Sequence, residues 1–553
     1  MRSYWREFIP KSIIYLKDYS WSIFRKDLIA GITVGITALP LAMAFAIASG
    51  VSPERGIFTA IVAGFLISAL GGSKVQIGGP TGAFVVIVSD IIIRNGYQGL
   101  ALSTLIAAVF LVVMGLCRIG SWIKYVPYPL VVGFTTGIAV IIFSTQVKDF
   151  FGLSLDSVPV NFLMKWAYYV RAFPTLHLPS FAIGASTLGL ILTIRRYCPR
   201  IPWGIAAIVF ATLLSQFLDL PVQTIESHFG ALPRTLLAPS IPSFSVSFEQ
   251  LRGILFDALA IALLGGLESL LSCVVADGMT GARHKSNCEL FSQGIANLGS
   301  ILFGGIPATG AIARTAANVK TGAQTPMAGM IHAVVLFLII LFFAPIVSKI
   351  PLAALAAILI MVAWNMSELP HFFHLLRAPA SDRAVLLTAF LLTVFVDIVY
   401  AVVLGMVLSC FLFMRRMSSL SRTANLTTLF EEPKDEVPDS KLMNVPPDVE
   451  IFEINGPFFF GAADLLQELD FQKPPRVFIL RMRKIPLIDA SGAYALTEFI
   501  CRYKRQGTIL YLSGVQESVK HDLCTFGVIN LIGEDAVFPD IDAALKKANL
   551  ILQ

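Results

Sequence analysis

The sequence predicts an all-α membrane protein that carries a small cytoplasmic α/β domain at its C-terminal end. Apolar residues make up 56% of the 553 residues and charged residues only 14%, whereas soluble domains contain about 25% charged residues. Apolar runs of spanning length recur from Leu28 to Phe413, which indicates a polytopic bundle of transmembrane helices. After Arg416, strand-like runs alternate with helical patterns, as in an α/β domain.

We predict fourteen transmembrane segments. They cover approximately residues 28–49, 55–71, 80–93, 98–117, 127–147, 180–197, 203–220, 254–277, 289–303, 310–320, 327–347, 350–366, 384–397 and 399–414. The segments 80–93 and 310–320 are much shorter than the roughly 20 residues that a straight span needs. Both begin with stretches that contain glycine and proline.

Basic residues predict the orientation of the bundle. If the N-terminus is cytoplasmic, the loops on that side carry most of the Lys and Arg residues, whereas the loops near 150–178 and 221–250 carry few. Both termini would then be cytoplasmic. Residues 1–25 lack the continuous apolar core of a signal peptide, so we expect an amphipathic segment at the membrane surface. The loop residues also explain the net charge of +6 without a nucleic-acid partner.

The composition divides the chain into four parts: a surface segment (1–25), a membrane domain (26–416), a charged, proline-rich linker (417–447) and an α/β domain (448–553). In the last part, strand-like runs occupy 450–460, 476–482 and 508–515. Helical patterns lie around 461–470, 491–505 and 516–526. The chain therefore has a membrane domain and a separate domain with its own core.

The membrane region contains an internal repeat. "IGGPTGAF" (77–84) and "FGGIPATGAIART" (303–315) each interrupt an apolar region as the third element of a seven-segment half. Because seven is odd, two tandem halves insert with opposite topology, which is the inverted repeat of secondary transporters. The alternative is that glycine and proline only allow close helix packing or a kink.

The interrupted segments predict an anion site. A half-helix that starts at Thr81 or Thr309 leaves its first N–H groups without partners and carries the positive end of the helix dipole. The two threonines can donate a hydroxyl or cap the half-helix. Arg314 lies one turn beyond Gly310, and a cation at this depth usually marks a function. The alternative for Arg314 is a loop position facing the cytoplasm.

Glu268 is the second intramembrane charge of interest. It follows two glycines in the middle of a span and can alternate between charged and neutral forms. A protonated Glu268 would remove repulsion of an anion and carry a proton with it. Its alternative role is a structural partner of Arg314. The cysteines show no metal spacing, and no catalytic constellation occurs in the spans, so we expect no metal, no cofactor and no enzyme.

These motifs resemble the sulfate permease (SulP) family of anion transporters. The matching stretches are residues 27–73, "IGGPTGAF", residues 266–290 and residues 303–329, and "MVAWNMSE" (361–368) resembles a bacterial branch that includes C4-dicarboxylate transporters. The tail resembles the STAS domain through "IPLIDASGAYAL" (485–496). The resemblance covers nearly the whole chain.

The resemblance implies a seven-plus-seven inverted repeat in which a core domain moves against a gate domain, commonly in a homodimer. It implies a substrate site between the third and tenth elements, completed by the first and eighth. In this sequence the corresponding residues are Phe45, Pro80, Thr81, Gly82, Glu268, Ser272, Thr309, Gly310, Ala311 and Arg314. Ser491 occupies the position that is phosphorylated in stand-alone STAS proteins. Its alternative role is a helix N-cap.

The chain departs from the similar sodium-coupled bicarbonate transporters. Those proteins have an Asp at the position of Glu268, a Thr one turn later and a Thr at the position of Ile312. Ile312 cannot bind sodium, and Ser272 only partly replaces the second threonine. Proton coupling through Glu268 is therefore the preferred hypothesis.

We expect proton-coupled uptake of C4-dicarboxylates (succinate, fumarate) or inorganic oxyanions (sulfate, bicarbonate) across a bacterial inner membrane, by alternating access. The alternatives are sodium-coupled sulfate or bicarbonate transport, anion exchange, an anion channel, or a nucleobase permease with the same repeat. Expected partners are the anion, a coupling proton or sodium ion, membrane lipid, a second copy of the chain and a cytoplasmic protein at the STAS domain.

Overall fold

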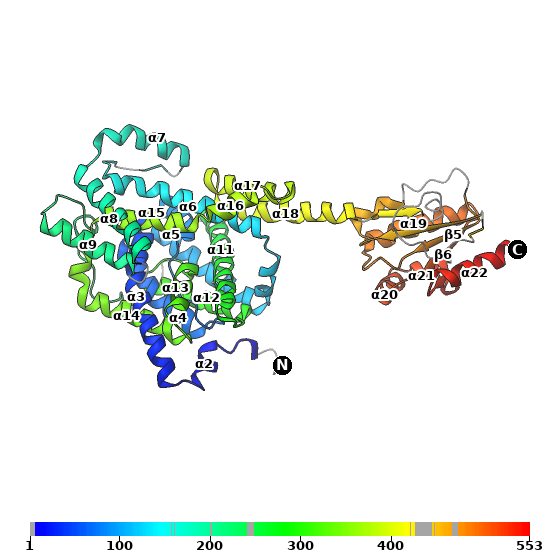
Figure 1. Cartoon of the computed structure of the whole chain (residues 1–553), viewed down its shortest axis with the longest axis horizontal. Coiled ribbons are helices and arrows are strands. Elements are labelled where there is room, and N and C mark those ends of the chain that lie inside the picture. The colour runs from blue at the N-terminus through cyan, green and yellow to red at the C-terminus, as the bar shows by residue number, and fades with distance from the viewer. Residues whose placement is uncertain are drawn as a thin grey trace. The chain divides into compact units, whose positions relative to one another are not determined.

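The chain forms two compact units, Met1–Met406 and Val407–Gln553, in the computed structural model. The structure describes residues 6–155, 158–159, 161–198, 202–240, 248–420, 422–425, 445–446, 448–466 and 474–553. Figure 1 shows the first unit as a bundle of helices and the second as a sheet with helices around it.

The first unit is almost entirely helical. Its α-helices are α2 (Lys11–Leu16), α3 (Trp21–Ala48), α4 (Pro53–Leu70), α5 (Gly82–Leu116), α6 (Tyr128–Phe151), α7 (Phe162–Ala172), α8 (Leu178–Tyr197), α9 (Trp203–Phe217), α10 (Ile225–Phe229), α11 (Phe248–Thr280), α12 (Ser286–Leu302), α13 (Ile312–Lys320), α14 (Met327–Val347), α15 (Leu352–Met366), α16 (Leu369–Leu375), α17 (Ala380–Phe395) and α18 (Ile398–Leu420). Two 3₁₀ helices, η1 (Ile119–Tyr125) and η2 (Phe173–Thr175), and two short strands, β1 (Gly78–Gly79) and β2 (Thr309–Gly310), complete it.

Nine helices of the described chain are long and apolar enough to cross a membrane. The expected segments 80–93 and 98–117 both lie in α5, whose backbone leaves the helical conformation at Gly96 (φ 64°, ψ −173°). The expected segment 203–220 forms α9, which is apolar but shorter than a span. The structure therefore establishes a polytopic helical fold, and the count of fourteen stays a prediction.

The helices pack in two groups. In the first group, α5 packs against α11 and α12, while α3 and α4 pack against each other and against α14. In the second, α6 packs against α15 and α17, and α8 packs against α9 and α15. The groups meet chiefly where α3 and α5 contact helices of the second group. Each group is thus a compact layer with a limited interface to the other.

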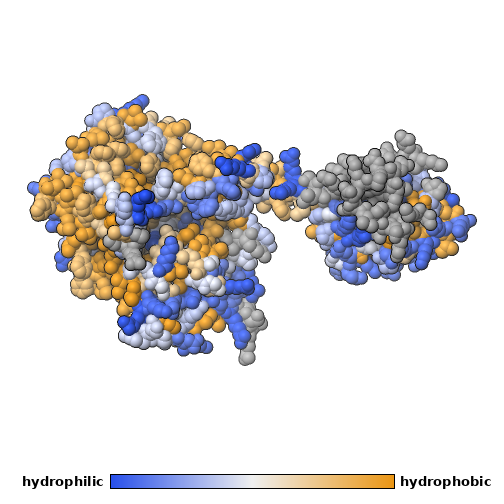
Figure 2. Space-filling model, in the orientation of Figure 1, coloured by the Kyte–Doolittle hydropathy of each residue, from blue (hydrophilic) through white to orange (hydrophobic). Residues whose placement is uncertain are grey.

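The surface of the first unit is apolar over a broad area. Figure 2 shows hydrophobic residues over much of the upper and left part of the helical bundle, with hydrophilic residues gathered at its lower end. Large side chains such as Phe217 of α9 and Phe342 of α14 are exposed there. Exposed apolar patches of this size are unusual in soluble proteins and are expected where helices face lipid.

The second unit is a five-stranded sheet with helices on both faces. Its elements are β3 (Arg422–Asn425), β4 (Val449–Asn455), η5 (Phe460–Leu466), β5 (Val477–Arg481), α19 (Ala490–Arg505), β6 (Ile509–Ser513), α20 (Glu517–Thr525), α21 (Val528–Ile532), η6 (Glu534–Ala536), β7 (Val537–Phe538) and α22 (Ile541–Leu552). The order is β3-β4-β5-β6-β7, with only β3 antiparallel to its neighbour. Alternate residues of β5 face opposite cores, Phe478 toward α19 and Ile479 toward α22.

The α/β prediction for this unit is confirmed, with local differences. The helical pattern expected at 461–470 forms the 3₁₀ helix η5, and residues 467–473 lie outside the described residues. The segment expected as a linker contains strand β3, while residues 426–444 lie outside the described part. β3 is four residues long and is held by β4, about 30 residues later along the chain. Such a short strand has no sequence pattern of its own.

Candidate functional site

The two interrupted segments meet in a small antiparallel sheet. β1 (Gly78–Gly79) pairs with β2 (Thr309–Gly310), and the Ala311 N–H donates to the carbonyl oxygen of Ile77 at 2.8 Å. The structure thereby brings together the two stretches that share the glycine and proline pattern.

Close packing explains why this sheet contains glycine. A Cβ atom on Gly310 would lie 1.6 Å from Nε2 of Gln76. That amide donates to the backbone oxygen of Ser269 at 3.1 Å and to its hydroxyl at 3.0 Å. A side chain at position 310 would therefore displace the contact that holds the sheet against α11.

Two helices begin beside the sheet without side-chain caps. α5 begins after the N-cap residue Thr81, and α13 begins after Ala311, with no side chain accepting a hydrogen bond from either first turn. Uncapped first-turn N–H groups concentrate the positive end of the helix dipole. The predicted start of the second half-helix at Thr309 is wrong, because Thr309 belongs to β2.

Both threonine hydroxyls turn toward α11 instead of capping a helix. Thr81 Oγ1 donates to Glu268 Oε2 at 2.8 Å, and Thr309 Oγ1 donates to the carbonyl oxygen of Gly265 at 2.6 Å. Gly265 and Glu268 are three residues apart and so lie on one face of α11. Both interrupted segments are thus tied to the same side of one helix. Of the two roles expected for the threonines, the hydroxyls act as donors, here to α11, and do not cap a helix.

Arg314 joins the two interrupted segments. It lies in the first turn of α13, its side chain is only 4% exposed, and its Nη2 donates to the carbonyl oxygen of Pro80. Its Nη1 is buried and has no hydrogen-bond partner in the part of the chain that the structure describes. A Cβ atom on Gly79 would lie 2.7 Å from that nitrogen. The alternative of an exposed loop arginine is therefore wrong.

Glu268 lies in α11 next to the start of α5 and is 7% exposed. Its carboxylate accepts a hydrogen bond from the Thr81 hydroxyl. No ion pair within 4.0 Å joins Glu268 to Arg314 in the described part of the chain. The two charges are nevertheless close enough to interact electrostatically, so Glu268 remains a candidate partner of Arg314 without a direct ion pair.

Phe45 and Ser272 contact different elements of this arrangement. A Cβ atom on Gly82 would lie 3.3 Å from Cε1 of Phe45 and 2.8 Å from Cδ1 of Ile142. Phe45 of α3 and Ile142 of α6 therefore cover the start of α5. The Ser272 hydroxyl is engaged behind the sheet, where it donates to Thr315 Oγ1 at 3.0 Å.

A buried polar network behind the sheet was not anticipated. Glu289 Oε1 accepts from Ser269 Oγ at 3.0 Å and from Gln293 Nε2 at 2.9 Å, and Glu289 Oε2 accepts from the Gly72 N–H at 2.9 Å. His332 is also buried, and neither of its ring nitrogens has a hydrogen-bond partner among the described residues. Glu289 lies in a stretch that resembles the family, but nothing in the sequence pairs it with Ser269.

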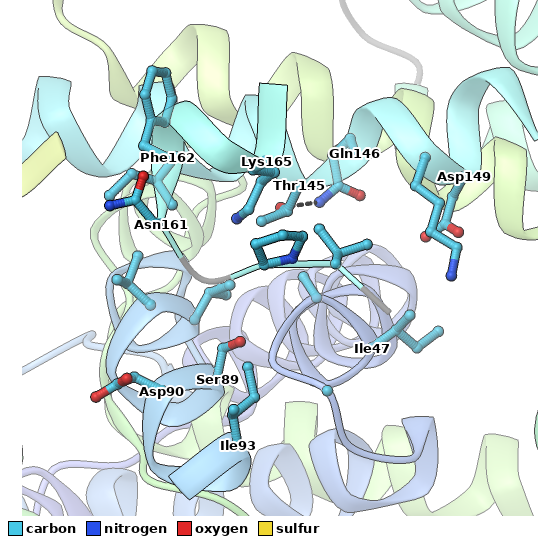
Figure 3. A pocket seen from close by; sticks show the side chains of 18 of the residues that line it. Ile47, Ser89, Asp90, Ile93, Thr145, Gln146, Asp149, Asn161, Phe162 and Lys165 are labelled. Carbon is cyan, nitrogen blue, oxygen red and sulfur yellow. Dashed lines mark hydrogen bonds between the residues drawn. The ribbon is translucent and has the colours of Figure 1, made fainter. Parts of the chain in front are cut away.

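A cavity of about 640 Å³ opens next to the start of α5. Figure 3 shows its lining side chains, which include Ser89 and Asp90 of α5, Thr145 and Gln146 of α6, and Lys165 of α7. The cavity reaches Val85, one turn beyond Gly82. Ala48, at the end of α3 away from the N-terminal segment, also lines it. The cavity therefore connects one face of the bundle to the neighbourhood of the uncapped helix start.

In the second unit, Ser491 is exposed in the first turn of α19. The N-cap is Asp489, whose Oδ1 accepts from the Gly492 N–H at 2.8 Å and whose Oδ2 accepts from the Phe460 N–H at 3.1 Å. The alternative that Ser491 caps this helix is therefore wrong. Its hydroxyl lies at a helix N-terminus and is accessible.

Known proteins show the same two-part organisation. Residues 24–389 match the sulfate permease family, and residues 440–544 match the STAS domain. The chain belongs to the sulfate permease family. The family match covers most of the first unit, and the STAS match covers most of the second. Multi-pass membrane insertion follows from this membership and from the apolar helices described above.

Relatives in the sulfate permease family match over nearly the full length. The putative sulfate transporter YvdB of Bacillus subtilis is 42% identical over 532 residues, 95% of this chain and 98% of that protein. The bicarbonate transporter BicA of Synechocystis is 30% identical over 546 residues, 95% of this chain and 94% of that protein. The solved structure of murine solute carrier 26 family member A9, an anion transporter, has a TM-score of 0.88 at 18% identity. The match covers 100% of this chain and 95% of the murine chain. At this identity the likeness shows a shared fold.

Proposed function

We propose that the protein is a secondary active transporter that carries a small oxyanion by alternating access. One observation carries the proposal: two uncapped helix starts converge on Arg314, whose Nη1 is buried without a partner. Backbone N–H groups and a guanidinium supply oriented donors for an anion. An anion at this position would satisfy groups that are otherwise costly to bury.

The substrate class we propose is sulfate or bicarbonate. Both present several acceptor oxygens to a site made of N–H donors, and the relatives described above are named as transporters of these anions. The C4-dicarboxylates succinate and fumarate, expected from residues 361–368, have no support from those relatives. They remain an alternative substrate class.

The packing of the helices supports alternating access. We propose that the group containing α3, α4, α5, α11, α12 and α14 is the core domain and that the group containing α6, α8, α9, α15 and α17 is the gate domain. The anion site lies on the core side of their interface, where Ile142 of α6 covers Gly82 of α5. The antiparallel pairing of β1 with β2 supports an inverted repeat of two seven-segment halves.

We propose that Glu268 couples transport to protons. The hydroxyl that contacts its carboxyl belongs to Thr81, at the start of α5. The protonation state of Glu268 is therefore linked to the helix start that faces the anion. A protonated Glu268 would accompany a bound anion, and an ionised one would repel it. Ile312 in place of a sodium-binding threonine favours protons over sodium, and sodium coupling or exchange is the alternative.

The remaining assignments concern location and partners. We propose that the protein lies in a bacterial inner membrane with both termini in the cytoplasm, so that the cavity faces outward. We propose domain limits of 26–416 and 448–553 and a homodimer as the working unit.

Because a phosphate at a helix N-terminus is stabilised by the helix dipole, we propose Ser491 as a regulatory site. It lies on a STAS domain for which we propose cytoplasmic protein partners.

Proteoliposomes test the function directly. Purified protein is reconstituted, and uptake of labelled sulfate and bicarbonate is measured under an imposed proton gradient, a sodium gradient or neither. We expect accumulation above equilibrium only with the proton gradient. Sodium-dependent uptake that ignores pH would overturn proton coupling, and no uptake of any tested anion would overturn the transport function.

An anion channel is the second candidate. A channel dissipates a gradient and cannot concentrate its substrate. Uptake that stops at electrochemical equilibrium in every gradient would therefore favour the channel. The burial of Arg314 and Glu268 favours the transporter, because a continuous open pore would expose such groups to water.

A further inference from the structure

The cavity next to α5 contains a cation that the anion site does not use. Lys165 lies in the middle of α7, a short helix between α6 and α8, and lines the 640 Å³ cavity. Figure 3 shows its amine directed into the cavity from above, close to Thr145. Asp149 lies farther along the same wall, beyond Gln146.

Lys165 is buried without a counter-charge. It is 7% exposed, and its amine forms no hydrogen bond or ion pair with the described residues. Burial lowers the pKa of the Lys165 amine. A buried ammonium without a partner is unfavourable, so a chain that keeps one beside an open cavity is expected to supply the partner from solution.

Two of the three acidic groups that line the cavity have partners of their own, and the third, Asp149, lies farther along the wall. Asp90 forms an ion pair with Arg94 at 2.6 Å. Asp397 accepts a hydrogen bond from the Val399 N–H at 2.6 Å. The second cation of the wall, Lys148, donates to the carbonyl oxygen of Leu155 at 3.0 Å. Among these charged groups Lys165 is the one left to attract a mobile ion.

We propose that Lys165 forms a second anion-binding site, which holds a small oxyanion in the cavity before it reaches Arg314. The cavity has room for a hydrated sulfate or bicarbonate ion, and its inner end at Val85 lies one turn from the start of α5. A cation in a cavity with low-dielectric walls raises the local concentration of anions. The site thus lies on the path between bulk solution and the anion site.

The inference rests on the proposed function for the identity of the anion, so its first test does not involve transport. Ser89, which lines the cavity, is changed to cysteine in the full-length protein in detergent. Its modification by an anionic and a cationic methanethiosulfonate of similar size is timed by mass spectrometry of the peptide that contains residue 89. The peptide readout separates this position from the seven native cysteines, all of which are free.

The ratio of the anionic to the cationic rate reports the potential in the cavity. Adding Lys165→Gln should lower this ratio about fivefold, and Lys165→Arg should preserve it. Sulfate or bicarbonate should slow modification by the anionic reagent in the presence of Lys165 and have no such effect in the Gln variant. Arg171→Gln is the matched control, because it removes one positive charge from an exposed position of the same helix. Lys165→Met replaces the Gln variant if the latter does not fold.

An unchanged ratio in Lys165→Gln, or an equal effect of Arg171→Gln, would overturn the proposal. Uptake kinetics then separate the two proposals. If the wild type transports, Lys165→Gln should raise KM about threefold and leave kcat unchanged, and an unchanged KM would overturn the delivery role. If the wild type transports nothing, the proposed function fails, while the rate ratio still decides whether Lys165 attracts anions.

Discussion

The guanidinium of Arg314 donates through Nη2 to the carbonyl oxygen of Pro80, a residue 234 positions earlier in the chain. This contact fixes the arginine across the sheet formed by β1 and β2 and leaves Nη1 buried without a hydrogen-bond partner among the described residues. A fixed cation between two helix starts costs little reorganisation when an anion enters. In the proposed function, the contact would link the two interrupted segments to anion recognition.

Gly310→Ala should destabilise the protein and abolish anion binding. The new methyl would lie 1.6 Å from Gln76 Nε2, so the sheet or the amide must move, at a cost of about 1–3 kcal/mol. Chemical denaturation of the purified protein measures the loss of stability. Gly189→Ala in α8 is the matched control, because a Cβ there meets nothing within 4 Å, and it should be neutral or slightly stabilising. Equal stability of the two variants would contradict the close approach.

Glu268→Gln should separate binding from coupling. Glutamine keeps the shape and can still accept the Thr81 hydroxyl, but it cannot exchange a proton. We expect sulfate binding that no longer varies with pH and uptake that falls to its level without a gradient. Glu226→Gln, at an exposed position of α10, should behave as wild type. Gradient-driven accumulation by Glu268→Gln would remove this carboxyl from the coupling mechanism.

Asp489→Ala and Ser491→Ala should differ in their effects on α19. Loss of the Asp489 cap exposes first-turn N–H groups and should destabilise the helix start by about 0.5–2 kcal/mol. Ser491→Ala, at an exposed site without a capping bond, should change stability by less than about 0.5 kcal/mol. Hydrogen exchange of the α19 amides in the full-length protein measures both. A larger effect from Ser491 would restore the capping role to the serine.

The sequence predicts the meeting of the two interrupted segments because their glycine and proline pattern is repeated. It does not predict where α13 begins, because pairing with β1 draws Thr309 and Gly310 into a strand. Burial of Arg314 was expected, but its carbonyl partner, Pro80, could not be identified from local pattern.

Long-range packing accounts for the features that sequence reasoning missed. The hydrogen bond between Ser269 and Glu289 joins two helices, and no local sequence motif indicates that these two residues form a pair. Lys165 lies in a segment interpreted only as an outward loop. Its burial depends on a cavity built by α3, α5, α6 and α7. Local periodicity carries no information about such an assembly.

Binding of radiolabelled sulfate and bicarbonate to detergent-purified protein tests the central claim most directly. If the helix starts and Arg314 form the anion site, wild type binds at least one of these anions saturably. Arg314→Ala should then weaken binding at least tenfold, and Arg314→Lys, which keeps the charge but loses the planar fork, should give an intermediate value. Arg171→Ala, on the exposed face of α7, should bind as wild type. Wild-type affinity in a folded Arg314→Ala protein would contradict the account.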